Sequence, residues 1–482
     1  MSSTVHPLPV LDEDCLHRVL HFLDRSTIVT FARTSRNGAL MTESHLVRDV
    51  QLDRSTKQLM AFCQFSLSRD VGSITKDLHI RGDAACRLAG ETDLYWRSVV
   101  ETLEQTLYKL TNLEHFSLHS NTLPGIYSLG RELPIAQTLL GRPLLRYLSV
   151  SGVDTPFLRM IHPIRGLHHL GIHVAHSAVR SSFIDAESIV TNMITNSIDT
   201  LTELSLSDIE PPYLVYSEYE AAVRINPTVR HLSLRHPTNF HYTISLERLA
   251  LAFPNIEHLS LVKSGMLLGQ SRSTLPIKSL KTDSALFPFQ AVSDTLTRIE
   301  FSKDKFLADG SVDWTIFLRS IGECPITHLS LPIFLREPNS PCLSQLAAAI
   351  PNIEVLDLSI TVAAWIESNV IFEYFTLPDL EEHPCFRHLQ YLRLDIFHTR
   401  KTTQADSENL IKCRKALAKA WIECLPSLVL VEVSMPIKLE GQDAIRSRLW
   451  WEREKSRNAV EISYAEGMSA RERYRWESSS DI

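Results

Sequence analysis

The stretch Leu246–Val262, LERLALAFPNIEHLSLV, predicts a helix, a turn and a strand in quick succession. Leu246, Leu249 and Phe253 recur at helical spacing, so their apolar side chains share one face. Pro254 then ends the helix, because proline lacks the N–H that a helical hydrogen bond needs. The segment IEHLSL that follows has the form L-x-x-L-x-L, which is typical of a short strand with one buried face. Such a unit cannot bury its apolar face alone, so it needs copies on either side.

Copies of this pattern run along most of the chain. Successive copies start about 19 to 39 residues apart, a wider scatter than the 20–29 residues of regular leucine-rich repeats. A dozen copies in order predict an α/β solenoid, a horseshoe of parallel strands with helices on the convex side. The twelve frames are Leu113/Phe116/Leu118, Leu145/Leu148/Val150, Leu167/Leu170/Ile172, Leu201/Leu204/Leu206, Val229/Leu232/Leu234, Ile256/Leu259/Leu261, Ile277/Leu280/Thr282, Leu296/Ile299/Phe301, Ile326/Leu329/Leu331, Ile353/Leu356/Leu358, Leu389/Leu392/Leu394 and Leu428/Val431/Val433.

Composition narrows the function classes. The formal net charge of −7 over 482 residues lacks the basic excess of a nucleic-acid-binding face. The chain shows neither a signal-peptide pattern at its start nor a stretch of ~20 apolar residues that could span a membrane. None of the eight cysteines forms a C-x-x-C pair, so we expect free thiols in a reducing compartment. These features predict a cytoplasmic or nuclear protein with no cofactor, metal, nucleic-acid partner or membrane partner.

Helices and insertions are expected between the strands. Apolar spacing predicts helices over 95–110, 314–321, 343–350 and 410–425, the last three followed closely by proline. The segments 125–140, 175–198 and 397–407 lengthen the interval between frames, so we expect them to be surface insertions. Residues 441–482 are rich in Arg and Glu and are expected to form a capping helix and a frayed, charged tail.

The N-terminal segment has a different, helical pattern. Leu16, Val19, Leu20 and Leu23 recur at helical spacing, and a second apolar helix is expected to begin around Ile28. Asn37-Gly38 is expected to close this second helix, because both residues tolerate the left-handed conformation of a helix C-cap. A third short helix is expected over 39–47. About 40 residues are too few for a robust core, so some of this apolar surface should face another part of the chain or a partner.

The segment LPVLDEDCLHRVLHFLDRSTIVTFARTSR resembles the F-box, and SHLVRDVQLD is similar to the segment that follows the F-box in fungal F-box/leucine-rich-repeat proteins. The resemblance covers residues 8–52; beyond them only the repeat architecture is similar. It implies an F-box-like domain over 1–50, repeats over 51–440 and a C-terminal region over 441–482. It also implies a substrate receptor of a cullin–RING ubiquitin ligase, with a Skp-type adaptor, a cullin scaffold and a protein target as partners. The implied adaptor-binding residues are Leu8, Pro9, Leu16, Val19, Leu20, Leu23, Ile28 and Phe31. The same residues could instead form an internal helical core.

The repeats present one candidate binding face. Because side chains alternate along a strand, positions three, five and seven of each frame point to the concave side. Position three carries several histidines, position five carries serines and then charged residues, and the face could equally be an ordinary solvated one. The predicted target-binding residues are His231, His258, Glu300, His328, Asp357, Arg393 and Asp395.

Catalysis finds little support in the sequence. No G-x-S-x-G or H-E-x-x-H motif is present, so we expect no catalytic residue. Two alternatives to the ligase interpretation stay open. One is a leucine-rich-repeat scaffold whose N-terminal helices are only a cap, and the weaker one is an enzyme with a site in the insertions.

Overall fold

A computed structural model describes the chain as two compact units, residues 1–212 and 213–482. Each unit is a mixed α/β structure built on an open sheet of mostly parallel strands, which is compatible with a solenoid. The boundary between these two units falls inside the predicted repeat region, 51–440. It does not test the domain limits expected from the sequence, which stay predictions. The described residues are 19–20, 23, 25–69, 71–81, 93–119, 133–174, 180–209, 225–235, 244–262, 267–268, 275–283, 287, 289, 292, 294–302, 314–335, 343–362, 386–398, 404–437, 445–453 and 459–474.

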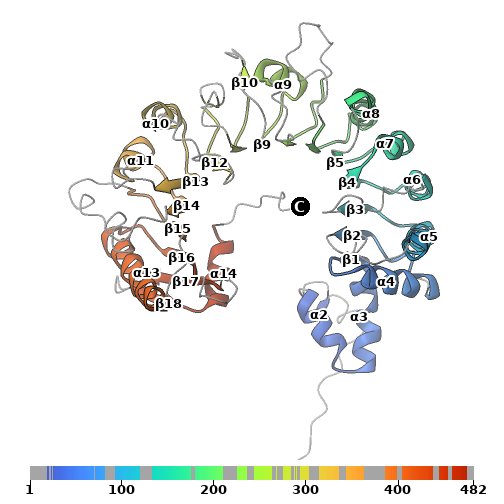
Figure 1. The fold of residues 1–482 in the computed structure, drawn as a ribbon, viewed down its shortest axis with the longest axis horizontal. Helices are drawn as coiled ribbons and strands as arrows, with labels where there is room; N and C mark the ends of the chain where they lie inside the picture. Colours follow the sequence, from blue (N-terminus) through green and yellow to red (C-terminus); the bar gives the residue numbers. More distant parts are fainter. Residues whose placement is uncertain are drawn as a thin grey trace, which may run out of the picture. The chain divides into compact units, whose positions relative to one another are not determined.

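Among the described residues of the first unit, helices α2 (Arg25–Ala32) and α3 (Arg36–Arg48) pack against each other. Its strands pair in parallel in chain order: β1 (Asp49–Leu52), β2 (Asp77–Arg81), β3 (His115–His119), β4 (Tyr147–Val153), β5 (His169–Val174) and β6 (Glu203–Ser207). The helices between them are α4 (Thr56–Ser68), α5 (Asp93–Lys109), α6 (Leu133–Leu140), α7 (Thr155–Ile161) and α8 (Arg180–Asn196). Helices α5 to α8 lie along one face of this sheet (Figure 1).

The second unit continues the same construction. Its parallel strands are β7 (His231–Arg235), β9 (His258–Val262), β11 (Ser279–Thr282), β12 (Arg298–Phe301), β13 (His328–Leu335), β14 (Val355–Val362), β15 (Tyr391–His398) and β16 (Leu430–Ile437). Two antiparallel strands, β17 (Ile445–Arg453) and β18 (Ala459–Ile462), complete this sheet. A separate parallel pair joins β8 (Ile244–Ser245) to β10 (Leu267–Leu268). The helices are α9 (Leu246–Ala252), α10 (Trp314–Gly322), α11 (Leu343–Ala349), α13 (Gln404–Cys424) and α14 (Tyr464–Glu472).

The repeat pattern of the sequence is confirmed at the level of strands. Each of the twelve frames coincides with one parallel strand from β3 to β16. In the organising stretch, α9 starts after Ser245, whose hydroxyl accepts a hydrogen bond from the Arg248 N–H, and β9 follows. Leu259 and Leu261 of β9 are almost fully buried, whereas the residues that alternate with them, His258, Ser260 and Val262, are half-exposed. The leucines therefore build the core of the sheet, and the alternate side chains form its polar face.

The predicted helices over 95–110, 314–321, 343–350 and 410–425 are confirmed as α5, α10, α11 and α13. The prediction that 125–140 and 175–198 are insertions was wrong for part of each segment. Residues 133–140 form α6, and residues 180–196 form α8, with Val190 and Met193 buried. Residues 397–398 end β15 and 404–407 begin α13, while 399–403 fall outside the described residues.

The prediction that Asn37-Gly38 closes a helix was also wrong. Ser35 is the N-cap of α3, and its hydroxyl accepts a hydrogen bond from the Gly38 N–H at 2.9 Å. A Cβ atom on Gly38 would lie 2.7 Å from the Phe31 carbonyl oxygen. Glycine is therefore needed for the close approach of two helices, not for a left-handed turn.

The C-terminal region differs from the expected cap and tail. The described part of residues 441–482 contains a helix, α14, but β17 and β18 precede it as an antiparallel pair. Residues 475–482 lie outside the described ranges. Within those ranges, no helix combines the length and the apolar character needed to cross a lipid bilayer.

Candidate functional site

The predicted target-binding residues all lie on one face of the second unit's sheet. The strand register aligns position three of neighbouring strands, so that His231 pairs with His258, and Arg298 of β12 pairs with His328. Position five forms the adjacent row, in which Glu300, Asp357, Arg393 and Glu432 belong to β12, β14, β15 and β16. Because these side chains alternate with the buried leucines, the face opposite the leucine core is polar.

Two histidines form a stacked pair at the start of this face. The imidazole rings of His231 and His258 have centroids 4.3 Å apart and an interplanar angle of 23°. Burial, reinforced by the neighbouring His231, lowers the pKa of His258 to about 4. His258 is therefore neutral at physiological pH, and the pair offers flat aromatic surface and ring nitrogens for hydrogen bonding.

The next strands carry a small group of opposite charges. Lys281 Nζ lies 2.8 Å from Glu300 Oε1, and Arg298 Nη2 lies 3.8 Å from Glu300 Oε2. Burial, followed by the nearby Arg298 charge, lowers the pKa of His328 to about 4. His328 Nδ1 also shares a 2.8 Å hydrogen bond with the Thr327 hydroxyl. All three charged side chains are partly exposed, so a protein partner could compete for them.

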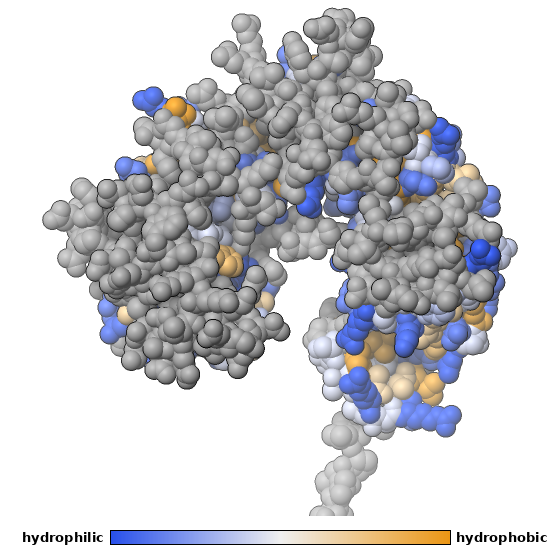
Figure 2. Space-filling view, viewed as in Figure 1, coloured by the Kyte–Doolittle hydropathy of each residue, from blue (hydrophilic) through white to orange (hydrophobic). Residues whose placement is uncertain are grey.

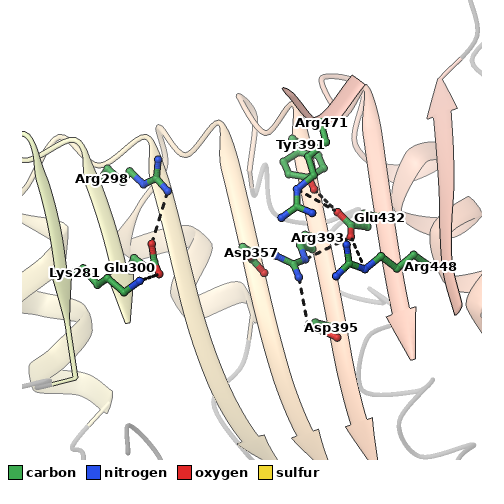
Figure 3. A network of polar contacts seen from close by, with 10 residues as sticks. All are labelled: Lys281, Arg298, Glu300, Asp357, Tyr391, Arg393, Asp395, Glu432, Arg448 and Arg471. Atoms are coloured by element: carbon green, nitrogen blue, oxygen red, sulfur yellow. Dashed lines mark hydrogen bonds and ion pairs between the residues drawn. The ribbon is translucent and has the colours of Figure 1, made fainter. Parts of the chain in front are cut away.

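The last predicted residues form a denser network around Arg393 (Figure 3). Arg393 Nη1 donates a 3.0 Å hydrogen bond to Asp357 Oδ2. Its other guanidinium nitrogens lie 3.6 Å from Asp395 Oδ2 and 3.6 Å from Glu432 Oε1. Burial alone would lower the pKa of Arg393, but Asp357 and Glu432 raise it above its ordinary value. Arg393 thus stays charged and holds three carboxylates together.

Glu432, which was not among the predicted binding residues, is the centre of this network. Its side chain is fully buried, and Tyr391 donates a 2.6 Å hydrogen bond from its hydroxyl to Glu432 Oε2. Arg448 of β17 and Arg471 of α14 place guanidinium nitrogens 3.8 Å and 3.9 Å from the two carboxylate oxygens. Burial and the Glu432 charge raise the pKa of Tyr391 well above its usual value, so this hydroxyl remains a donor.

Helix α14 covers this end of the polar face. Trp450 of β17 is in register with Glu432, so both side chains lie on the polar side of the sheet. A Cβ atom on Gly467 of α14 would lie 2.2 Å from the Trp450 ring, which places α14 on that side. The adjacent Trp451 points to the other side, where α13 packs against β16 to β18. The predicted site thus has two parts. The open part, from β7 to β13, carries partly exposed polar side chains, whereas the part from β14 to β17 carries more deeply buried charges that pair with one another.

The polar face of the first unit is built from histidine–carboxylate pairs. Their nitrogen–oxygen distances are 2.6 Å for His115–Asp77, 2.9 Å for His169–Glu203 and 2.6 Å for His173–Asp208. Sequence reasoning located His115 and His169 on this face but missed the carboxylates, because their strands are neighbours only in the fold.

Two further side chains connect these pairs. Tyr147 lies between them, with its ring centroid 4.0 Å from that of His115 and 5.8 Å from that of His169. Burial, then the charge of Arg81, lowers the pKa of His119 to about 4, and His119 Nε2 lies 3.1 Å from the Ser149 hydroxyl. Among the described residues, no group of three or more His, Cys, Asp or Glu side chains is arranged to hold a metal ion.

The predicted adaptor-binding residues are only partly described. Leu8, Pro9 and Leu16 lie outside the described residues. Val19 is 45% exposed and Leu20 is 1% exposed, so only the first presents its side chain to solvent. Leu23 and Phe31 are half-buried, and Ile28 is buried. Leu40 of α3, which the sequence did not single out, is 58% exposed. Figure 2 shows apolar surface interspersed with hydrophilic surface over these N-terminal helices.

No protein-family model and no curated protein matches this sequence.

Proposed function

We propose that the chain is the substrate-recognition subunit of a cullin–RING ubiquitin ligase, in which an F-box docks a Skp-type adaptor and a leucine-rich-repeat horseshoe binds a protein target. The resemblance of residues 8–52 to the F-box motivates the proposal. In this function the chain performs no chemistry. It would accelerate ubiquitin transfer by holding the target close to a conjugating enzyme, because proximity converts an encounter between two molecules into an intramolecular step.

The observation that carries the proposal is the apolar surface of the N-terminal helices. Val19 and Leu40 expose about half of their side chains to solvent although both are aliphatic. Exposed aliphatic side chains on a short helical segment suit a protein-binding surface. The partner in this proposal is the Skp-type adaptor.

The open part of the polar face, from β7 to β13, is the proposed target-binding surface. It combines the stacked pair His231–His258 with the exposed charges of Lys281 and Glu300. Polar side chains of both signs on a rigid sheet suit the recognition of a folded protein, because complementary charges select the partner and its orientation.

A leucine-rich-repeat scaffold with no ligase role is the second candidate. The burial of Leu20 and Ile28 favours it, since both side chains behave as core residues of a cap and cannot contact an adaptor directly. Adaptor binding separates the two functions.

The test is size-exclusion chromatography of the purified full chain mixed with a purified Skp-type adaptor. The proposal predicts co-elution in a one-to-one complex, which the double variant Val19→Asp/Leu40→Asp abolishes. Leu251→Asp is the matched control, because Leu251 of α9 is also aliphatic and 51% exposed. The control should co-elute like the wild type. Absence of a complex with the folded wild type would favour the scaffold function.

A further inference from the structure

Helix α14 packs on the polar face through a small set of side chains, of which Ala470, Met468 and the following Tyr474 join the hydrophobic cluster around Tyr391 and Trp450. Of its residues, only Gly467 and Ala470 are buried, and most of the others are exposed. Tyr474, just after the helix, stacks on Tyr391 with ring centroids 5.3 Å apart and an interplanar angle of 13°. Helices that bury little apolar surface open more readily than the sheets they cover.

The side chains of the surface beneath α14 are more deeply buried than those of the helix itself. Trp450 and Glu432 are fully buried, and Tyr391 is 5% exposed. Among the described residues, Trp450 Nε1, Glu432 Oε1 and Arg393 Nε have no hydrogen-bond partner. Arg471 of α14 comes no closer than 3.9 Å to Glu432, which is too far for a hydrogen bond. Glu432 Oε1 and Arg393 Nε face each other at 3.6 Å, and Glu432 Oε2 accepts a hydrogen bond from the Tyr391 hydroxyl. The Glu432 carboxylate therefore keeps the capacity to accept a further hydrogen bond, which Arg471 does not donate.

The charges on this surface indicate which partner would satisfy it. Asp357, Asp395 and Glu432 surround the single guanidinium of Arg393, so the parallel strands contribute an excess of negative charge. Arg448 of β17 offsets one negative charge, and Arg471 is the contribution of α14. A guanidinium is the group that best matches a buried carboxylate, because it can donate two parallel hydrogen bonds.

We propose that α14 is an exchangeable internal occupant of a binding site for an arginine-bearing helix of a partner protein, formed by Tyr391, Arg393, Glu432 and Trp450. The partner's arginine would replace Arg471 and donate hydrogen bonds to Glu432, and small side chains next to it would pack on Trp450 as Gly467 does. This inference extends the proposed role of the repeats in target binding and does not depend on adaptor docking. In this account, the full chain keeps the site closed until a competing helix arrives.

The first test measures opening of α14 in the full-length chain by hydrogen–deuterium exchange. The proposal predicts that amides of residues 466–474 exchange about 100-fold faster, or more, than those of β15 and β16, since the helix opens without the sheet. Equal protection of α14 and these strands would overturn the proposal, because the helix would then be an integral part of the core.

The second test displaces α14 without altering the surface beneath it. In Gly467→Val the added side chain collides with Trp450, whose Cγ would lie 2.2 Å from the new Cβ. The probe is a fluorescein-labelled peptide of residues 463–474, SYAEGMSARERY, which carries the arginine and the small residues of α14. Fluorescence anisotropy should show at least tenfold tighter peptide binding by Gly467→Val than by the wild type, because its site is open.

Two altered peptides test the recognition chemistry. A peptide with Arg471→Glu should lose binding to the Gly467→Val chain, because its carboxylate would face Glu432. A peptide with Arg473→Glu is the matched control and should bind within about twofold, since Arg473 is 64% exposed and its ion pair is with the partly exposed Glu452. Equal binding of all three peptides would overturn the assigned chemistry.

The remaining outcomes also decide the proposal. No peptide binding by a folded Gly467→Val chain with fast-exchanging α14 amides would overturn it, and so would a variant that no longer folds, because α14 would then belong to the cooperative core. Adaptor binding by Gly467→Val should equal that of the wild type, so failure of this proposal is distinguishable from failure of the ligase proposal.

Discussion

Replacing Glu432 with glutamine should destabilise the second unit more than neutralising any exposed charged side chain would. The substitution keeps the side chain's size and an oxygen that can accept the Tyr391 hydroxyl hydrogen bond. It removes the negative charge that faces Arg393, Arg448 and Arg471. Arg393 and Arg471 have side chains that are 13% and 14% exposed, so water can compensate little of the loss.

The magnitude follows from this burial. Removing one partner of a buried ion pair costs about 3–5 kcal/mol, because the remaining charge is left desolvated. The 3.6–3.9 Å separations from the arginines are longer than hydrogen bonds, and Asp357 and Asp395 still offset part of the Arg393 charge. We therefore expect the free energy of unfolding to fall by about 3 kcal/mol, at the lower end of that range.

Urea unfolding followed by tryptophan fluorescence is a suitable assay, because Trp450 is in register with Glu432 and reports on this part of the sheet. The matched control is Glu423→Gln. Glu423 forms an i,i+4 pair with Lys419 on α13, with side chains 51% and 64% exposed, so the control should change stability by less than about 0.5 kcal/mol. An equal, small change in both variants would refute the argument that the buried network stabilises this unit.

Three further predictions concern packing, a helix terminus and pH. Gly72→Ala should lower the free energy of unfolding by about 1–3 kcal/mol in thermal unfolding, because the added Cβ would lie 2.2 Å from the last carbonyl oxygen of α5. The control Gly141→Ala, whose Cβ would have its nearest contact at 3.4 Å, should be close to neutral. Arg453→Met should selectively speed amide exchange at the end of α13, because Arg453 donates hydrogen bonds to the carbonyls of Ile422 and Leu425; unchanged exchange would contradict this role. Stability should decrease as the pH falls from about 6.5 to about 4, since His258, with its folded-state pKa near 4, takes up a proton more readily in the unfolded chain. His258→Gln should flatten this pH dependence in urea titrations, and an unchanged slope would count against it.

The strands were predictable because their pattern is local. In frames such as Ile256/Leu259/Leu261, one face of the strand is covered by the helical layer and the other is polar, so side-chain alternation is visible in the sequence. The helix over 180–196 was missed because the segment lengthens the interval between two frames and was therefore interpreted as an insertion, although its buried positions, Val190 and Met193 among them, are spaced as in a helix.

The covered end of the polar face could not be predicted, and the reason is visible in β17. Helix α14 covers one side of this strand and α13 the other, so Trp450 and Trp451 are both buried although they point in opposite directions. A strand that is buried on both sides loses the alternation that marks a single apolar face. Likewise, the sequence located Arg393 and Asp395 on the polar face but not the burial of Glu432, which depends on a helix that comes later in the chain.

Hydrogen–deuterium exchange of the full chain, with and without a purified Skp-type adaptor, tests the central claim most directly. The ligase account predicts that the adaptor slows exchange in the N-terminal helices, over residues 25–48, and leaves strands β7 to β13 unchanged and open to a target. Protection confined to the repeats, or no protection anywhere at saturating adaptor, would contradict it.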